Sequence, residues 1–220
     1  NAQPVQQICK GMELIIKDSI DHGFITQKEI LSLLNNKKLS PIGKEIAGIN
    51  TRQLEDELSL HPLVDNVECF HTPGGRIAIE ITQRLPILRV MASNGDNYYI
   101  DEKGRIMPLP NNAANVAVVT GMVDRNFAIK ELYEFGLFLQ HHPLWKAQIQ
   151  QINVTPAKEL ELVPRVGEHI IFLGKPENYE QKFERLKKFY RKALNQIGWN
   201  KYSRISLEFD NQIICTQKEQ

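Results

Sequence analysis

The stretch TRQLEDELSLHPLVDNVECFHTPGGRIAIEITQRLP, residues 51–86, contains the pattern of one helix followed by the pattern of two strands. Asn50 or Thr51 can cap the helix, because short polar side chains accept hydrogen bonds from the first free backbone N–H groups. Leu54 and Leu58 are four residues apart and therefore lie on one face of that helix. One helix and one half-buried hairpin cannot make a domain, so this stretch predicts a partner strand and a partner helix elsewhere in the chain.

The two strand patterns are joined by Gly74-Gly75. Glycine tolerates the positive φ angles of tight turns, so this dipeptide predicts a two-residue hairpin. Because side chains alternate along a strand, Glu68, Glu80 and Thr82 are expected to face outward. The residues expected on the opposite, inner face are Val67, Cys69, Ile77, Ile79 and Ile81.

The chain upstream supplies both missing elements. Residues 12–17 alternate apolar and charged side chains, which predicts a first strand. Thr26 followed by Glu29 is a capping-box pattern and predicts the start of a helix. The order strand, helix, helix, strand, strand closes at the end of the quoted stretch. We therefore expect one domain over residues 1–85 and a second over residues 86–220.

The second domain is predicted to be rich in strands, with two longer helices. Asp124 can cap the first of these helices, and Pro143 ends it. Pro176 suits the first position of the second helix, and the basic residues late in that helix suit its dipole. The buried stripe of this helix would be Phe183, Leu186, Tyr190, Leu194 and Ile197.

The predicted strands of the second domain end in a hairpin. They cover residues 87–91, 98–101, 105–107, 116–120, 149–154, 159–163 and 169–173, and the closing hairpin joins 202–209 to 212–217 across Asp210-Asn211. The fold class is therefore α+β, with a small βααββ domain followed by a larger mixed β-sheet domain with flanking helices.

Composition excludes several classes of function. The formal net charge is +1, with 27 basic and 26 acidic residues interleaved, which argues against a nucleic-acid footprint. No apolar run is long enough to span a bilayer. The cysteines Cys9, Cys69 and Cys215 are widely spaced and show neither metal-ligand pairing nor a disulfide framework. All three are expected to be free thiols.

No set of residues predicts catalysis. Cys69 and His71 lie two apart on a strand, where they are side by side and cannot meet as a thiol-imidazole pair. His141-His142 ends a helix, but adjacent helical residues diverge and no third metal ligand is evident. The glycines lie in turns and belong to no phosphate-binding pattern. The sequence therefore predicts no enzyme, no metal and no cofactor.

Four segments resemble the FtsQ/DivIB family of bacterial division proteins. The first is Pro62-Leu63-Val64 before the second strand, and the second is the strand exit Gln83-Arg84-Leu85-Pro86. The third is Tyr98-Tyr99-Ile100-Asp101-Glu102-Lys103-Gly104, and the fourth is the late strand Ile205-Ser206-Leu207-Glu208-Phe209-Asp210. The family usually has an aromatic residue at the position of Leu63, and Asp and Arg at those of Ser206 and Glu208. The first 86 residues resemble a POTRA domain, which is a small strand-helix-helix-strand-strand module.

The resemblance implies a non-enzymatic scaffold of the divisome. Its implied partners are the FtsB-like and FtsL-like division proteins, and the POTRA-like domain is a second possible contact for other division proteins. The implied location is the bacterial inner membrane, crossed once by a helix outside this chain, with the chain on the periplasmic side of the septum. The alternative is a POTRA-bearing component of outer-membrane protein assembly or secretion machinery, whose membrane domains have lipid-facing strands and aromatic girdles. The two amphipathic helices and few aromatic residues here favour the first reading.

The partner is expected to bind at the end of the chain. The last predicted strand has no later strand to cover it, so its edge offers unpaired backbone groups for strand addition. Phe209 is the expected apolar contact. The full set of expected partner-binding residues is Phe209, Asn211, Gln212, Ile213, Ile214, Cys215, Thr216 and Gln217.

Overall fold

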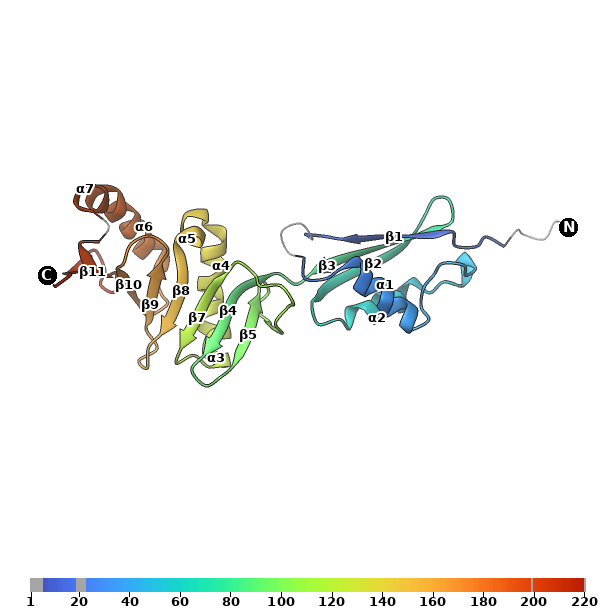
Figure 1. Cartoon of the computed structure of the whole chain (residues 1–220), viewed down its shortest axis with the longest axis horizontal. Coiled ribbons are helices and arrows are strands. Elements are labelled where there is room, and N and C mark those ends of the chain that lie inside the picture. The colour runs from blue at the N-terminus through green and yellow to red at the C-terminus, as the bar shows by residue number, and fades with distance from the viewer. Residues whose placement is uncertain (1–5, 19–22, 199, 220) are drawn as a thin grey trace. The chain divides into compact units, whose positions relative to one another are not determined.

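The computed structural model describes residues 6–18, 23–198 and 200–219 (Figure 1). Contacts group the chain into two compact units. One unit runs to Leu85 and includes Pro110–Ala114, and the other contains Pro86–Leu109 and Asn115–Gln220. The sequence did not predict that residues 110–114 would group with the first unit. Independent folding of each unit stays a prediction.

The first unit has the predicted order of elements. These are β1 (Gly11–Ile16), α1 (Gln27–Asn36), the short 3-10 helix η1 (Ile46–Gly48), α2 (Thr51–Ser59), β2 (Val64–Thr72) and β3 (Arg76–Gln83). Strand β3 is central in the sheet, parallel to β1 and antiparallel to β2. The predicted βααββ fold is confirmed.

The inner face of this sheet is the predicted one. Cys69 of β2 lies opposite Ile79 of β3, and both side chains are buried. Glu68 is exposed and Glu80 is half-buried on the other face. The two helices cover the inner face with the buried side chains of Ile30, Leu34, Leu54 and Leu58.

Both helices begin with the side-chain caps that the sequence predicts. The Thr26 hydroxyl accepts a hydrogen bond from the N–H of Glu29 at 3.2 Å. Asn50, and not Thr51, caps α2, because its side-chain oxygen accepts from the N–H of Gln53 at 3.1 Å. Each cap satisfies one backbone donor that has no partner within the helix.

The turn between β2 and β3 is longer than predicted. Thr72 pairs with Arg76, so the connection has three residues and the prediction of a two-residue hairpin is wrong. Pro73 has no N–H with which to continue the ladder, so the strands separate one residue earlier. Gly74 and Gly75 both adopt positive φ, at 85° and 75°, as the turn requires.

The second unit is built on a nine-stranded mixed sheet. Its order is β12-β11-β10-β9-β8-β7-β4-β5-β6. The strands are β4 (Pro86–Ala92), β5 (Asn97–Asp101), β6 (Ile106–Met107), β7 (Ala117–Gly121), β8 (Ile149–Val154), β9 (Leu160–Pro164), β10 (Ile170–Gly174), β11 (Tyr202–Ser206) and β12 (Ile214–Gln217). The larger sheet domain with helices is therefore confirmed as a fold, although the sequence did not predict the strand order.

Helices pack onto this sheet to form a single core. They are α3 (Arg125–Phe127), α4 (Tyr133–His141), α5 (Pro143–Gln148), α6 (Tyr179–Phe189) and α7 (Asn195–Ile197), with the π-helical segments η2 (Ala128–Leu132) and η3 (Tyr190–Leu194). Phe135, Trp145 and Phe183 are buried in the same cluster as the strand residues. A Cβ atom at Gly136 of α4 would come within 2.7 Å of Leu88, so glycine is needed for this close approach.

Two details of the predicted second helix are wrong. The helix begins at Tyr179 and not at Pro176, because Asn178 before it adopts left-handed backbone angles. Ile197 is 46% exposed and does not belong to the buried stripe. Phe183, Leu186 and Tyr190 are buried as predicted, and the side chain of Leu194 lies outside the described part of the chain.

The closing hairpin is shorter in its strands and longer in its connection than predicted. Strand β11 ends at Ser206 and β12 begins at Ile214. The connection therefore contains Leu207, Glu208, Phe209, Gln212 and Ile213, which were expected in the strands, together with the predicted turn residues Asp210 and Asn211. Asn211 adopts a left-handed φ of 62°, which takes the chain out of the extended conformation.

Candidate partner-binding edge

Strand β12 lies at one edge of the large sheet. Its only strand neighbour in the described chain is the antiparallel β11, with Ile205 opposite Cys215 and Ser206 opposite Ile214. A bulge in β11 between Tyr202 and Arg204 shifts the register near the end of β12. The other side of β12 is an open sheet edge.

Two hydrogen bonds show which backbone groups of β12 face β11. The N–H of Lys218 donates to the C=O of Lys201 at 3.1 Å, and the C=O of Thr216 accepts from the Ser203 hydroxyl at 3.3 Å. Successive residues of an edge strand point their backbone groups alternately toward the neighbour and away from it. The N–H and C=O groups of Cys215 and Gln217 therefore point out of the sheet. Within the described part of the chain, no hydrogen bond satisfies these outward groups.

The side chains of β12 divide between the two faces of the sheet. Cys215 is half-buried and packs against the core, opposite the buried Ile205. Burial raises the pKa of the Cys215 thiol, so this group stays protonated at neutral pH. Ile214 lies on the other face and is 46% exposed. Thr216 and Gln217 are also exposed.

A side chain of helix α6 bonds to the connection before β12. Nη2 of Arg185 in α6 donates to the carbonyl oxygens of Leu207 at 3.3 Å and of Phe209 at 3.1 Å. Leu207 is buried, whereas the Phe209 side chain is 47% exposed. Ile213 is half-buried and packs against the core. Arg185 thus fixes the backbone of the segment that leads into the open edge.

The structure brings only part of the predicted binding set onto the edge. Ile214, Cys215, Thr216 and Gln217 form β12. Phe209 is exposed but lies before the strand, so any contact that it makes would flank the edge. Asn211 and Gln212 are exposed in the connection. Partner binding by any of these residues stays a prediction.

The edges of the small sheet differ from β12, because helix side chains bond to them. At β2, the N–H of Cys69 donates to Oε1 of Glu55 in α2 at 2.8 Å. At β1, the C=O of Leu14 accepts from Nε2 of Gln27 in α1 at 3.0 Å. A side chain that occupies an edge hydrogen-bonding group blocks pairing with another strand there. Neither contact could be predicted from the sequence, because helix periodicity does not reveal that Glu55 or Gln27 reaches a strand edge.

The cysteine and histidine residues considered above lie in different surroundings. Burial, followed by the nearby Glu55 charge, raises the pKa of Cys69 to about 12, so its thiol is not a nucleophile at neutral pH. His71 is exposed, and Nδ1 of His142 lies 2.6 Å from the carbonyl oxygen of Phe138. Cys9, Cys69 and Cys215 are free thiols.

One buried polar pair was missed by the sequence analysis. His169 is 1% exposed, and its Nε2 lies 2.9 Å from the hydroxyl oxygen of Tyr190. The pair joins the start of β10 to η3, and burial raises the pKa of Tyr190 to about 12. No group of three or more histidine, cysteine, aspartate or glutamate residues in the described chain could hold a metal ion.

Comparison with known families assigns both parts of the chain. The family described as FtsQ/DivIB, C-terminal related, matches residues 85–216. A POTRA-like domain matches residues 7–82. The search of curated proteins found no match. Among the described residues, no helix has the length and apolar character needed to cross a membrane.

Proposed function

Because the chain belongs to the FtsQ/DivIB C-terminal related family, we propose that it is a non-enzymatic scaffold of the bacterial divisome that binds partners by strand addition to β12. The FtsQ/DivIB proteins are membrane-anchored division scaffolds. The proposed partners are FtsB-like and FtsL-like division proteins, and the scaffold would link early to late division proteins. The proposed location is the periplasmic side of the inner membrane at the septum, with the membrane helix outside the 220 residues.

The observation that carries this proposal is the open edge of β12. Cys215 and Gln217 direct backbone donors and acceptors outward, and no hydrogen bond satisfies them within the described chain. On each edge of the small sheet a helix side chain, Glu55 or Gln27, bonds to one backbone group, whereas no helix side chain in the described chain bonds to an outward group of β12. A partner strand would pair with these groups directly.

The size of this edge implies that side chains must contribute to binding. Cys215 and Gln217 each offer one donor and one acceptor, which allows four backbone hydrogen bonds. At roughly 0.5–1.5 kcal/mol each, they would supply about 2–6 kcal/mol before the entropy of association is subtracted. A micromolar complex needs about 8 kcal/mol. Exposed apolar groups beside the edge, Ile214 and Phe209, are the proposed source of the remainder.

Paired proline substitutions test the proposal. Cys215→Pro removes an outward N–H and so spares the ladder to β11. Thr216→Pro removes an inward N–H and should cost about 1–3 kcal/mol of stability. The binding partner would be the extracytoplasmic part of the FtsB-like protein from the same bacterium, with affinity measured by calorimetry and unfolding by thermal melting.

The two variants should differ in which property they lose, partner binding or stability. Cys215→Pro should keep a melting temperature close to that of the wild type and lose partner binding. Thr216→Pro should melt at a lower temperature. Unchanged affinity in a folded Cys215→Pro variant would show that the interface lies elsewhere. Phe209→Ser should weaken binding without affecting the fold, because the side chain is half-exposed.

A further inference from the structure

A run of basic residues lies on the helix beside the last two strands. Helices α6, η3 and α7 follow one another without a break from Tyr179 to Ile197. From Lys187 to Lys201 the sequence contains five cations and no acidic residue. Four of the five, Lys188, Arg191, Lys192 and Lys201, have exposed side chains. These four residues are called the basic helix end.

The cations of the basic helix end form no ion pair within the described chain, although the exposed Glu184 lies one turn before Lys188. No ion pair among the described residues involves any of the four. Lys188 and Lys192 are four positions apart on the helix, where like charges repel. The π-helical segment η3 contains Arg191 and Lys192, and such segments often occur at functional sites. An anionic partner would relieve the repulsion between Lys188 and Lys192.

The helix dipole does not explain the position of these charges. Cations stabilise a helix only within its last turn. The continuous helix ends at Ile197, so Lys188 lies nine residues before that end and Lys192 lies five residues before it. The sequence analysis extended this helix to Ile197 as well, so its expectation that these cations serve the dipole is wrong for Lys188 and Lys192.

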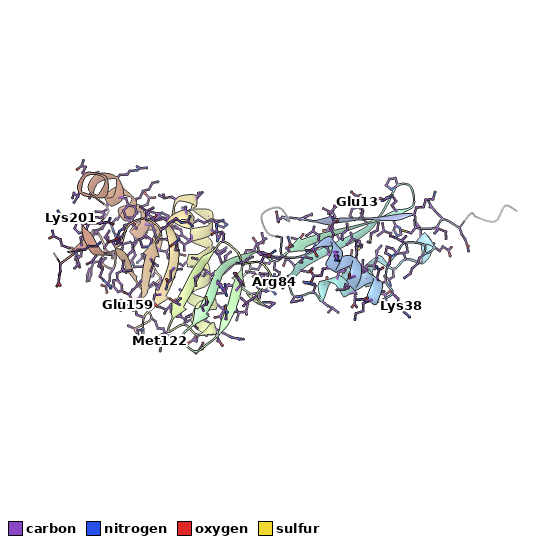
Figure 2. The ribbon with its side chains drawn as sticks, viewed as in Figure 1. Glu13, Lys38, Arg84, Met122, Glu159 and Lys201 are labelled. Atoms are coloured by element: carbon purple, nitrogen blue, oxygen red, sulfur yellow. The ribbon has the colours of Figure 1, made fainter. Side chains whose placement is uncertain are left out.

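Three contacts place the basic helix end beside β12. The ring centroids of Phe189 and Tyr202 are 6.0 Å apart, so the helix touches the start of β11. Tyr202 pairs with Gln217 of β12. Lys201, labelled in Figure 2, accepts a backbone hydrogen bond from Lys218 just after β12. A strand added to β12 would therefore end near Lys201, at the end of the sheet that the helix with the other three cations contacts through Phe189.

We infer that the partner of β12 carries an acidic segment next to its pairing strand, and that the basic helix end binds this segment. This inference rests on the proposed function, because it needs a strand on β12 to bring the acidic segment into reach. A peptide fits better than a lipid surface. A helix that lies on a membrane exposes an apolar face, whereas Phe183, Leu186 and Tyr190 of this helix are buried in the core.

Charge neutralisation in the full chain tests the inference. The basic variant is Lys188→Gln, Arg191→Gln and Lys192→Gln together. Its matched control is Lys130→Gln, Lys146→Gln and Arg165→Gln, which removes the same charge from exposed residues of the same unit. The probe is the extracytoplasmic part of the FtsB-like protein, and affinity is measured at low and at high salt, with Cys215→Pro as a third arm.

The expected result is a loss of partner affinity in the basic variant but not in its control. Its affinity should fall about tenfold at low salt, as expected for three partly exposed charge pairs, and its salt dependence should become shallower. The control should bind like the wild type. Because the three side chains are exposed and form no ion pair, the basic variant should melt close to the wild-type temperature, which separates lost binding from lost folding.

The outcomes distinguish this inference from the proposed function. Equal affinities of the basic variant and its control, with binding lost in Cys215→Pro, would overturn the inference and leave the edge assignment intact. Unchanged binding in Cys215→Pro would overturn the edge assignment, and the inference with it. Binding of the wild type to phosphatidylglycerol vesicles that is lost in the basic variant would assign these cations to lipid and also overturn the inference.

Discussion

At the scale of single residues, burial decides whether a side chain such as the Cys69 thiol can react. Cys69 has a neighbouring histidine in sequence, yet it is 7% exposed and faces the inner side of the small sheet. Alternation along the strand was enough to predict this position, because the inward set of Ile77, Ile79 and Ile81 fixes the parity of the hairpin. The bond from the Cys69 N–H to Glu55 could not be predicted, because it depends on how closely α2 approaches β2.

The raised pKa of Cys69 predicts how stability depends on alkaline pH. Burial holds the thiol pKa at about 12 in the folded protein, against a usual value of 9.0. The unfolded chain therefore releases this proton first as the pH rises above about 9, which favours unfolding. The contribution of Cys69 to stability should be complete below pH 9 and should decline as the pH approaches 12.

A comparison with Cys69→Ala isolates this effect. Urea unfolding of wild type and variant should give a difference in stability that is constant from pH 7 to about 9 and narrows above it. The comparison is needed because Tyr190 also has a raised pKa, of about 12, and contributes a similar alkaline loss to both proteins. A difference that stays constant up to pH 11 would contradict a buried, protonated thiol.

At the scale of elements, the sequence predicted most helices and strands but not their neighbours. Some features depend only on residues that are close together in the sequence and could therefore be predicted. These are the caps at Thr26 and Asn50 and the alternating patterns of β2 and β3. The order of nine strands depends on pairings between distant segments, such as β7 beside β4. The start of β12 was predicted too early because Gln212 and Ile213 suit a strand in the sequence, whereas pairing with β11 begins only at Ile214.

Substitution of Glu55 tests whether its bond to the Cys69 N–H protects the β2 edge from pairing with another strand. Glu55→Ala removes the acceptor of the Cys69 N–H and should cost about 1 kcal/mol of stability. It should also open the β2 edge to pairing, so the variant should self-associate more than the wild type in light scattering at equal concentration. Glu55→Gln keeps an acceptor oxygen and serves as the control. If Glu55→Ala stays monomeric and fully stable, the bond does not protect this edge.

At the scale of the whole molecule, the two family matches and the two compact units divide the chain at nearly the same place. The matches cover residues 7–82 and 85–216, and the first unit reaches Leu85. The amino-acid sequence alone predicts this division, because the first set of elements closes at Pro86 and the pattern changes after it. It did not indicate that Pro110–Ala114 groups with the first unit, because nothing local in those five residues points to a distant neighbour.

The last prediction concerns the autonomy of the first unit. A fragment that ends at Arg84 keeps the bonds from the Arg84 backbone N–H to Leu63 and from its Nη1 to Pro62. It also keeps Gln83, which is fully buried, accepts from the Ile25 N–H at 2.9 Å and donates to the Lys17 C=O at 3.0 Å. These contacts close the small sheet without any residue from the second unit.

This fragment should therefore fold alone, with a sigmoidal thermal transition and dispersed amide signals in NMR, although domains of this size have small margins of stability. Gln83→Ala in the same fragment should lower its stability by about 1–3 kcal/mol, because it leaves the Ile25 N–H buried without its acceptor. Collapsed amide dispersion in the unsubstituted fragment would mean that residues beyond Arg84 are needed. Restoration of folding by a longer fragment that includes Pro110–Ala114 would then assign that segment to the first domain and move the domain boundary.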